Sequence, residues 1–350
     1  MAKKILLISD TSYKPVKMFL DQVPKLAKGF IRLGNDVRYF PYNGILRQLS
    51  PFKSRRLSTL LYKNKADSML STFAANYKPD IVIIGGFPRY FDRVSVDRMR
   101  EGSPDAIYIG MDGDPWPKLN PGRIETATGY DIMTAFNDGQ WLQDYRDAGV
   151  PFCVFIPNCC DPDVDHRYDV DEKWRSDILW IGTIRHAINI GTALRRELVT
   201  KLADRENCKL YACLGRPKIG GMDYLYAISG ARIGLSISAS EPVKLYDSDR
   251  LIRLLSCGTL VLARRFPDCE LLFEDGKHLR YFDTIEQFFD LADWYLEHEK
   301  ERKIIADAGM KRTHEQFSGT KIAGYFLELV ETGRYTARWF EYLSTAKMNR

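Results

Sequence analysis

The chain has 350 residues, of which 45% are hydrophobic, 12% aromatic and 28% charged, with a formal net charge of +5. This length is typical of about two domains, and it allows a core large enough to fold without disulfide bonds or structural metals. The aromatic content and the mixed charge exclude disorder as the main state, and no apolar run is long enough to span a membrane. A charge of +5 is too mild to indicate nucleic-acid binding by itself.

The cysteines and the first residues indicate the compartment. The seven cysteines form no CxxC pair, and no Cys/His group has the spacing of a zinc site. We therefore expect reduced, mostly buried thiols in a cytoplasmic protein without a metal centre. The opening MAKKILLISD has a short apolar run without a cleavage site, so it is predicted to be a β-strand and not a signal peptide.

The N-terminal half alternates short apolar runs with helical patterns. Continuous apolar runs bounded by Pro and Gly, such as PDIVIIG, are typical of parallel strands that are buried on both faces. Strands are predicted at residues 4–9, 36–40, 79–85, 106–111, 132–136 and 152–156. The pattern predicts an α/β domain with a parallel sheet over residues 1–157.

The same alternation begins again after a polar stretch rich in aspartate, residues 157–176, which we interpret as the linker. Helical patterns end the chain, and the first of them opens with a Thr284–Gln287 capping box. Strands are predicted at residues 178–182, 209–213, 232–236 and 259–263. We expect a second Rossmann-like domain over residues 177–329 and a last helix, about residues 330–350, that packs back on the first domain.

Ligands of doubly wound sheets bind at the carboxyl ends of the strands, so the residues there are the candidates. The motifs GxGxxG, GxxxxGKS/T and GxSxG are missing, which disfavours a nicotinamide cofactor, a P-loop nucleotide site and an esterase. The strand predicted at 178–182 ends in Gly182, Thr183 and Arg185. A glycine lets backbone N–H groups approach a phosphate and an arginine neutralises its charge, although a plain turn also explains the glycine.

Two segments carry a family resemblance: SDRLIRLLSCGTLVLARRFPDCELLFEDGKHLRYFD at residues 248–283 and IEQFFDLADWYLEHEKERKIIADAGMKR at residues 285–312. They resemble the glycosyltransferases akin to spore-maturation proteins, which are group 1 nucleotide-sugar glycosyltransferases of the GT-B fold. The close resemblance covers about residues 178–317, and the first half matches in layout only. It implies an α/β GT-B architecture, with two Rossmann-like domains facing each other across a cleft.

The resemblance also implies an activity. The chain would be a glycosyltransferase that moves a sugar from a nucleotide-sugar, expected to be a UDP-sugar, to a hydroxyl acceptor such as a glycan or glycoconjugate, without a bound metal. The helix that begins at Ser248, Asp249 and Arg250 would direct its amides toward the diphosphate. Arg250 matches the arginine of the family and would neutralise the leaving group. Gly182 and Thr183 would add backbone contacts.

Glu241, Lys244 and Tyr246 precede this helix, and the resemblance implies that they face the donor sugar or the ribose. One position departs from the family. Arg253 stands four residues before the Cys-Gly pair, where the superfamily has a glutamate that holds the ribose hydroxyls. The ribose must then be held differently, with Asp249 as one candidate, or the donor is unusual. The stereochemistry of transfer, retaining or inverting, stays open for the same reason.

A carboxylate of the first domain would serve as general base if the transfer inverts. Asp112 and Asp114, in GMDGDPW, follow the strand predicted at 106–111, and the family often has an acidic element here. Trp116 beside them would stack on a sugar or a base. A tight turn capped by aspartate explains the same residues. Asp10, at the end of the first strand, is a further candidate.

A basic segment at residues 52–65, FKSRRLSTLLYKNK, raises the question of whether the protein has a further partner. Its cations alternate with apolar side chains and are Lys53, Arg55, Arg56, Lys63 and Lys65. A solvated face or a mobile loop on the acceptor side explains this composition. Contact with a membrane surface or with a polyanionic acceptor explains it as well.

Three alternatives to this function stay open. A glycosyltransferase that modifies DNA bases is compatible with the basic segment. A non-catalytic protein that binds nucleotide-sugars is compatible with Arg253 in place of the glutamate. The third is an enzyme of the same fold with a different reaction, such as a sugar epimerase.

Overall fold

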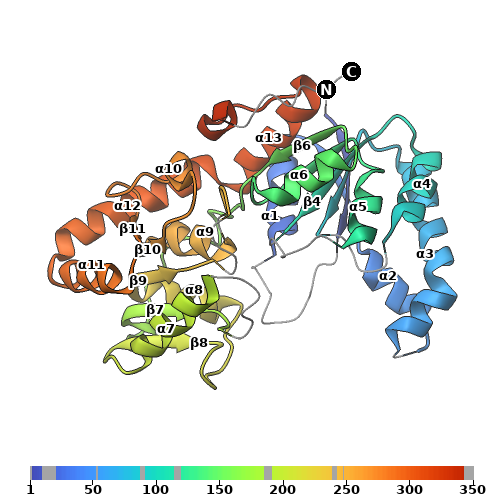
Figure 1. Cartoon of the computed structure of the whole chain (residues 1–350). Coiled ribbons are helices and arrows are strands. Elements are labelled where there is room, and N and C mark those ends of the chain that lie inside the picture. Colours follow the sequence, from blue (N-terminus) through green and yellow to red (C-terminus); the bar gives the residue numbers. More distant parts are fainter. Residues whose placement is uncertain are drawn as a thin grey trace. The chain divides into compact units, whose positions relative to one another are not determined.

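The chain forms two compact units, which Figure 1 colours along the sequence. The computed structural model describes residues 2–9, 21–52, 54–86, 91–113, 120–184, 191–238, 243–246 and 248–342. Unit 1 consists of Met1–Thr11, Leu26–Ile156 and Ala323–Arg350, and unit 2 of Ser12–Lys25 and Pro157–Ile322. Within the described ranges, no helix is both long and apolar enough to cross a membrane.

Unit 1 is built on a six-stranded parallel sheet with the order β2-β1-β3-β4-β5-β6. Its strands are β1 Lys4–Ser9, β2 Asp36–Phe40, β3 Ile81–Gly85, β4 Ile107–Asp112, β5 Ile132–Ala135 and β6 Phe152–Phe155. β3 is buried along its whole length, as its unbroken apolar run predicts. It lies between β1 and β4, and the register places Ile83 between Leu7 and Ile109.

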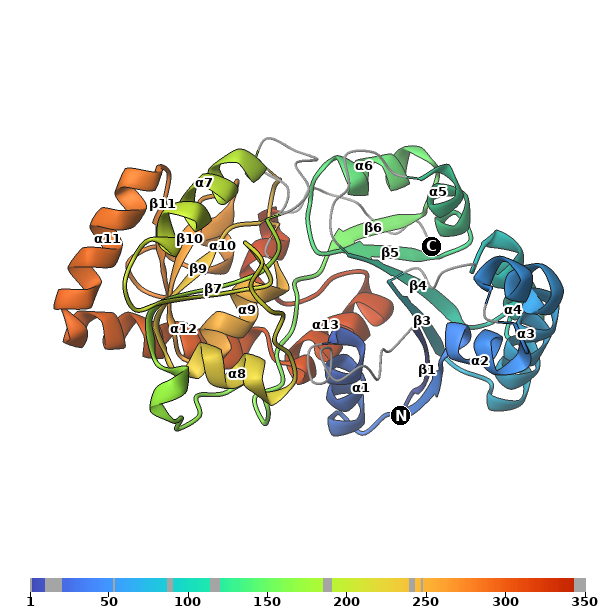
Figure 2. The ribbon, with the colours of Figure 1, turned by 90° about the horizontal axis from the view of Figure 1, so that it is seen from below.

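Helices cover both faces of this sheet (Figure 2). α1 and α13 lie on one face, where the rings of Phe30 and Phe326 are 6.2 Å apart, and α2, α3 and α4 lie on the other. The helices are α1 Gln22–Arg32, α2 Tyr42–Leu49, α3 Arg55–Tyr77, α4 Arg93–Gly102, α5 Pro121–Ala127, α6 Gln140–Asp147 and α13 Gly319–Thr332. The prediction of one helix over about 330–350 is wrong for the described part: residues 330–332 end α13, residues 333–337 are not helical, and Arg338–Tyr342 form a short 3-10 helix. The remaining residues lie outside the described part.

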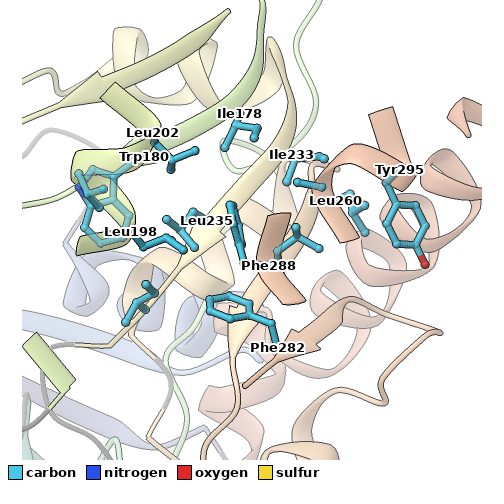
Figure 3. Packing of buried hydrophobic residues seen from close by; sticks show 14 of the residues in the cluster. Ile178, Trp180, Leu198, Leu202, Ile233, Leu235, Leu260, Phe282, Phe288 and Tyr295 are labelled. Carbon is cyan, nitrogen blue, oxygen red and sulfur yellow. The ribbon is translucent and has the colours of Figure 1, made fainter. Parts of the chain in front are cut away.

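Unit 2 has a five-stranded parallel sheet with the order β11-β10-β9-β7-β8. Its strands are β7 Ser176–Ile181, β8 Cys208–Tyr211, β9 Ala231–Ser236, β10 Leu260–Arg264 and β11 Arg280–Phe282. Its helices are α7 Gly191–Ala203, α8 Met222–Ser229, α9 Asp249–Ser256, α10 Cys269–Leu272, α11 Ile285–Glu297 and α12 Glu299–Gln316, and a 3-10 helix spans Glu172–Trp174. The core lies between the sheet and the helices α7 and α11, where Trp180, Leu235 and Phe288 are fully buried (Figure 3).

The predicted fold class is confirmed, because both units are doubly wound parallel sheets with helices on their two faces. Ten strands lie within two residues of their predicted bounds. The short strand β11 was not predicted, because its three residues are too few to give a pattern. The basic segment is helical from Arg55 onward, where it forms the start of α3. The interpretation of the segment as a mobile loop is therefore wrong for that part.

Residues 157–176, the stretch interpreted as a linker, bond to the rest of unit 2. Cys160 forms an isolated parallel bridge with Ser318. Asp165 is fully buried and accepts a hydrogen bond from Lys25 Nζ at 2.5 Å. The Tyr168 amide donates to Ser229 Oγ at 3.1 Å. These contacts explain why a polar sequence is ordered here.

Candidate functional site

The carboxyl ends of β7 and β9 mark the point where unit 2 reverses its strand order. From β7 the chain continues to β8 on one side, whereas β9 leads to β10 on the other side. Ligands of open parallel sheets bind outside the strand ends at such a switch point. Ile181 ends β7, and Ile237 follows β9.

Arg250, in the first turn of α9, brings its guanidinium to this point. Nε donates to the carbonyl oxygen of Ile181 at 2.7 Å, and Nη1 donates to that of Ile237 at 3.0 Å. The guanidinium carbon lies 4.3 Å from the centroid of the Trp180 ring, a cation–π contact. These contacts fix the cation, and among the described residues no carboxylate forms an ion pair with it.

A second guanidinium lies at the same strand end. Arg195 of α7 is 7% exposed and donates from Nη2 to the carbonyl oxygen of Thr183 at 2.5 Å. Its guanidinium carbon is 5.1 Å from the centroid of the same Trp180 ring. The indole Nε1 of Trp180 donates in turn to the carbonyl oxygen of Gly182 at 2.9 Å. One buried indole therefore holds two cations beside the turn that follows β7.

Space requires the glycine at position 182. A Cβ atom on Gly182 would lie 2.6 Å from Nη2 of Arg250 and 3.1 Å from the Trp180 ring. A larger residue would displace the guanidinium. The glycine thus has a physical reason in this structure, the close approach of Arg250, in addition to turn geometry.

The start of α9 offers further hydrogen-bond donors. The N–H groups of a first helical turn have no acceptor within the helix, and the helix dipole favours an anion there. Ser248 is the N-cap residue, yet its side chain makes no capping bond. Its Oγ is buried and has no hydrogen-bond partner among the described residues. A ligand oxygen at this position would satisfy a hydroxyl that is otherwise costly to bury.

Asp249 and Arg253 form an ion pair on α9, with Nη2 and Oδ2 2.7 Å apart. The Arg253 side chain is 7% exposed, and its guanidinium carbon lies 5.5 Å from the centroid of the Tyr224 ring. Partial desolvation opposes ionisation of Asp249, but the charges of Arg253 and Arg250 outweigh it and lower its pKa. The position that holds a glutamate in the superfamily therefore carries a buried cation, bonded to the half-exposed carboxylate of Asp249.

The structure describes two of the four remaining residues that were predicted to bind the donor. Lys244 Nζ lies 3.6 Å from the Asp268 carboxylate. Tyr246 is 2% exposed, which leaves little surface for a ligand. Arg185 and Glu241 lie outside the described residues.

Cations at the opposite, amino end of the same sheet are paired with carboxylates. Arg232, in β9, donates to Asp177 at 3.0 Å. Arg302 of α12 is 8% exposed, donates to the carbonyl oxygen of Arg232 at 3.2 Å and lies 3.9 Å from Glu299. Arg250 differs from them, because carbonyl oxygens and an aromatic ring hold it instead. In the parts that the structure describes, no three His, Cys, Asp or Glu side chains are grouped to hold a metal ion.

In unit 1, Asp112 ends β4 and is 3% exposed. Its Oδ2 accepts a hydrogen bond from Tyr145 Oη at 2.6 Å, and its Oδ1 accepts from the Gly113 amide at 2.8 Å and from Arg123 Nη1 at 3.2 Å. Burial and the charge of Asp112 raise the pKa of Tyr145, so the phenol keeps its proton and remains a donor. Asp10, Asp114 and Trp116 lie outside the described residues.

The two motifs that carry the resemblance have structural reasons. Gly258 follows Cys257, the C-cap residue of α9, with φ of +72°, and a Cβ atom there would lie 2.4 Å from the Arg167 guanidinium, so only glycine fits. Asp275 accepts from the Tyr281 amide at 3.0 Å and from Arg280 Nε at 3.0 Å, which closes the loop before β11. The motifs therefore stabilise the fold of unit 2, whereas Arg250 lies at the candidate site.

Arg195 and Tyr145 are among the site residues that the sequence did not reveal. A signal for Arg195 exists, because it shares a helical face with the buried residues Leu198, Val199 and Leu202. A cation on an otherwise apolar face must find a buried partner. Tyr145 gives no such signal, because its contact with Asp112 joins residues 33 positions apart.

Comparison with known proteins now decides the fold. Residues 195–328 match the family model described as glycosyl transferase-like. A glycosyltransferase from Rickettsia africae has a TM-score of 0.60 and 12% identity, covering 94% of this chain and 98% of its own. This chain has the GT-B fold. HepE of Anabaena, solved with UDP and glucose, has a TM-score of 0.57 and 12% identity, covering 93% and 99%. The sucrose-phosphate synthase of Thermosynechococcus elongatus has a TM-score of 0.58 and 11% identity, covering 94% and 98%.

No curated protein matches the chain in sequence. At identities of 11–13%, the solved structures show the GT-B fold and leave the substrates to the chemistry of the site. The family-model match begins at Arg195 and includes Arg250. It therefore covers both guanidiniums beside Trp180, on the half of the chain where the close resemblance lies.

Proposed function

We propose that unit 2 binds the diphosphate of a nucleotide-sugar, and that the protein is a glycosyltransferase that transfers the sugar to a hydroxyl acceptor. The observation that carries the proposal is the Arg250 guanidinium, held at the switch point by two carbonyl oxygens and without a carboxylate partner among the described residues. A diphosphate would supply the missing negative charge. The glycosyl transferase-like match of residues 195–328 supports the same class of reaction.

We infer a UDP-sugar as the donor, because HepE, a structural neighbour, is solved with UDP and with UDP-glucose. The resemblance of residues 248–283 supports a place near the spore-maturation-like group and a role in making a glycan or glycoconjugate. All seven cysteines are free thiols, which supports the proposal that the protein acts in the cytoplasm.

The leaving diphosphate gains negative charge as the bond to the sugar breaks. The guanidiniums of Arg250 and Arg195 are fixed before the reaction, so they would stabilise that charge without reorganisation. Ser248 Oγ and the N–H groups of α9 would add hydrogen bonds. We propose that these groups replace a metal ion. Transfer should then be unchanged by EDTA, and a loss of activity that Mg²⁺ restores would contradict this part.

The acceptor hydroxyl requires a base if the transfer inverts. Asp112, Asp114 and Asp10 are the proposed candidates. The hydrogen bonds from Tyr145, Gly113 and Arg123 occupy both oxygens of Asp112. This geometry supports two roles for Asp112 equally: a base, or a residue that positions Tyr145 and Arg123 near the acceptor.

The experiment is a thermal-shift panel of UDP-, GDP- and TDP-sugars, followed by measurement of nucleotide release with a broad acceptor set. We expect UDP and UDP-sugars to raise the Tm more than the other nucleotides, since binding to the folded state alone stabilises it. Stabilisation by none of the nucleotides would contradict the proposal. A shift with GDP- or TDP-sugars instead would correct the donor and keep the class.

A non-catalytic nucleotide-sugar-binding protein is the second candidate. The observation that favours it is Arg253, a buried cation where the superfamily has a glutamate for the ribose. Binding of the donor without acceptor-dependent release of the nucleotide would support this candidate. Release that depends on a DNA acceptor would support a DNA-modifying glycosyltransferase instead.

A further inference from the structure

The first three turns of α3 expose large hydrophobic side chains. Leu60 is 79% exposed, Leu61 57% and Leu57 44%, and Phe52 just before the helix is 44% exposed. Eleven large hydrophobic side chains are exposed among the described residues, and four of them lie in this stretch of ten positions. Scattered exposed hydrophobics need no explanation, whereas such a cluster marks an interaction surface.

The fold holds this cluster outward. The opposite face of α3 is buried through Ala66 and Leu70. Ser58 is also buried, and its Oγ bonds to Ser50 Oγ at 2.7 Å, which fixes the turn before the helix. Leu57, Leu60 and Leu61 stand three and four positions apart and so share one helical face. The leucines therefore cannot turn inward without breaking the packing of the helix.

The sequence around the same cluster is rich in positive charge. Residues 37–66 contain no Asp or Glu, and their seven cations are Arg38, Arg47, Lys53, Arg55, Arg56, Lys63 and Lys65. Since the whole chain carries +5, the remainder of the chain has a net charge of −2. The excess positive charge of the protein is thus concentrated in this one segment.

The cations of the segment do not all have the same role. Lys63 is 17% exposed and bonds to Asp67 at 2.6 Å and to Asp92 at 2.9 Å, so it belongs to the packing of α3 against α4. Arg56 and Lys65 are exposed. They stand four positions before Leu60 and four positions after Leu61, at the two ends of the leucine cluster.

We propose that the α3 surface, formed by Phe52, Arg56, Leu57, Leu60, Leu61 and Lys65, docks on the surface of a membrane that contains anionic lipids. Cations near such a surface gain electrostatic energy, and leucines beside them gain energy by entering the boundary between headgroups and acyl chains. A soluble polyanion such as DNA would use the cations and leave the leucines in water. The combination of both groups on one helical face therefore favours the lipid surface.

The test is co-sedimentation of the full chain with vesicles, without nucleotide, so its result does not depend on the donor site. Vesicles of phosphatidylcholine alone are compared with equal mixtures of phosphatidylcholine and phosphatidylglycerol. We expect binding to the mixed vesicles only, weakened by salt. The double variant Leu60→Asp/Leu61→Asp should bind about tenfold less, and Arg56→Glu/Lys65→Glu should lose binding to a similar extent.

Matched controls lie on α12 in unit 2. Ile304 is 60% exposed and Lys311 is 76% exposed, so Ile304→Asp and Lys311→Glu make the same kinds of substitution, one residue at a time, on a different helix. Both should bind like the wild type, and all variants should keep the wild-type Tm. The absence of binding to mixed vesicles, or equal binding by the leucine variant, would overturn the proposal. So would binding to immobilised heparin that the leucine variant retains in full, because a soluble polyanion would then be the partner.

Discussion

The two units present opposite charges at the ends of similar strands. At the end of β7 in unit 2, carbonyl oxygens and an indole hold the guanidiniums of Arg250 and Arg195. At the end of β4 in unit 1, Tyr145 and Arg123 hold the carboxylate of Asp112. The first arrangement holds cations through the partial charges of carbonyl oxygens and a ring, whereas the second holds a carboxylate beside a cation.

This difference assigns the two ends different tasks. A fixed cation with carbonyl partners attracts an anion, because each carbonyl carries only a partial charge. A buried carboxylate that accepts hydrogen bonds from Tyr145, Gly113 and Arg123 is satisfied by its own unit, and its removal takes an acceptor from these donors. Substitutions at the end of β7 should therefore act through ligand affinity, and substitutions at the end of β4 through stability.

The largest expected effect on stability is that of Asp112→Ala. It removes the carboxylate that accepts hydrogen bonds from the buried Tyr145 hydroxyl and from the Arg123 guanidinium, which should lower the free energy of unfolding by about 3 kcal/mol. Urea unfolding measures it. Asp97→Ala is the matched control, because Asp97 is half-exposed and pairs with Arg93 on the surface of α4, so its loss should cost less than about 1 kcal/mol. Equal costs for both variants would remove the contrast.

Gly182→Ala should separate affinity from stability in unit 2. The new Cβ would contact Nη2 of Arg250, so the guanidinium must shift, and binding of UDP should weaken roughly tenfold, equivalent to about 1.4 kcal/mol. Calorimetric titration with UDP measures it. In Gly44→Ala the nearest contact of the new Cβ is Pro41 at 3.4 Å, so affinity should not change. An unchanged affinity in Gly182→Ala would mean that the ligand does not depend on Arg250.

Arg195→Met tests the cation that the sequence did not reveal. Methionine keeps most of the buried volume but removes the charge, so UDP should bind several-fold more weakly while the Tm changes little. A double variant with Arg250→Lys should show a combined effect different from the sum, because both side chains contact Trp180. Additive effects would indicate that the two cations act at separate places.

The smallest effect concerns pH. The pKa of Asp249 is lowered in the folded state, so its ion pair with Arg253 contributes stability that is complete above the unfolded pKa of about 3.9 and is lost as the pH falls below it. The carboxylate is half-exposed, so the contribution should be below about 1 kcal/mol. Asp249→Asn should flatten the acid limb of the stability profile slightly, and a variant profile parallel to that of the wild type would contradict this.

The sequence predicted the framework better than the site. Unbroken apolar runs such as residues 81–85 predict buried parallel strands because little else buries five consecutive apolar residues. Arg250 was predicted through the resemblance and through its place at the start of a helix. Its reach to two carbonyl oxygens was not, because those atoms lie 69 and 13 positions away along the chain. The same limit applies to Tyr145 on Asp112.

For the basic segment, composition cannot distinguish exposed cations from paired ones. Its composition suggested a partner for all of its cations. The structure of the helix shows that they differ, because Lys63 pairs with carboxylates of unit 1 while Arg56 and Lys65 are exposed. Composition alone gives each cation equal weight. The direction of each side chain on α3 decides which of them can meet a partner.

The most direct test of the central claim is the affinity for UDP of three proteins: the wild type, Arg250→Ala and Arg302→Ala. Both arginines bond to backbone carbonyl oxygens, but they lie at opposite ends of the same sheet. We predict that Arg250→Ala weakens UDP binding roughly a hundredfold, equivalent to about 2.7 kcal/mol, while Arg302→Ala lowers the Tm and keeps the wild-type affinity. Wild-type affinity in a folded Arg250→Ala variant, or an equal loss in both variants, would contradict the claim that the carboxyl end of β7 is the diphosphate site.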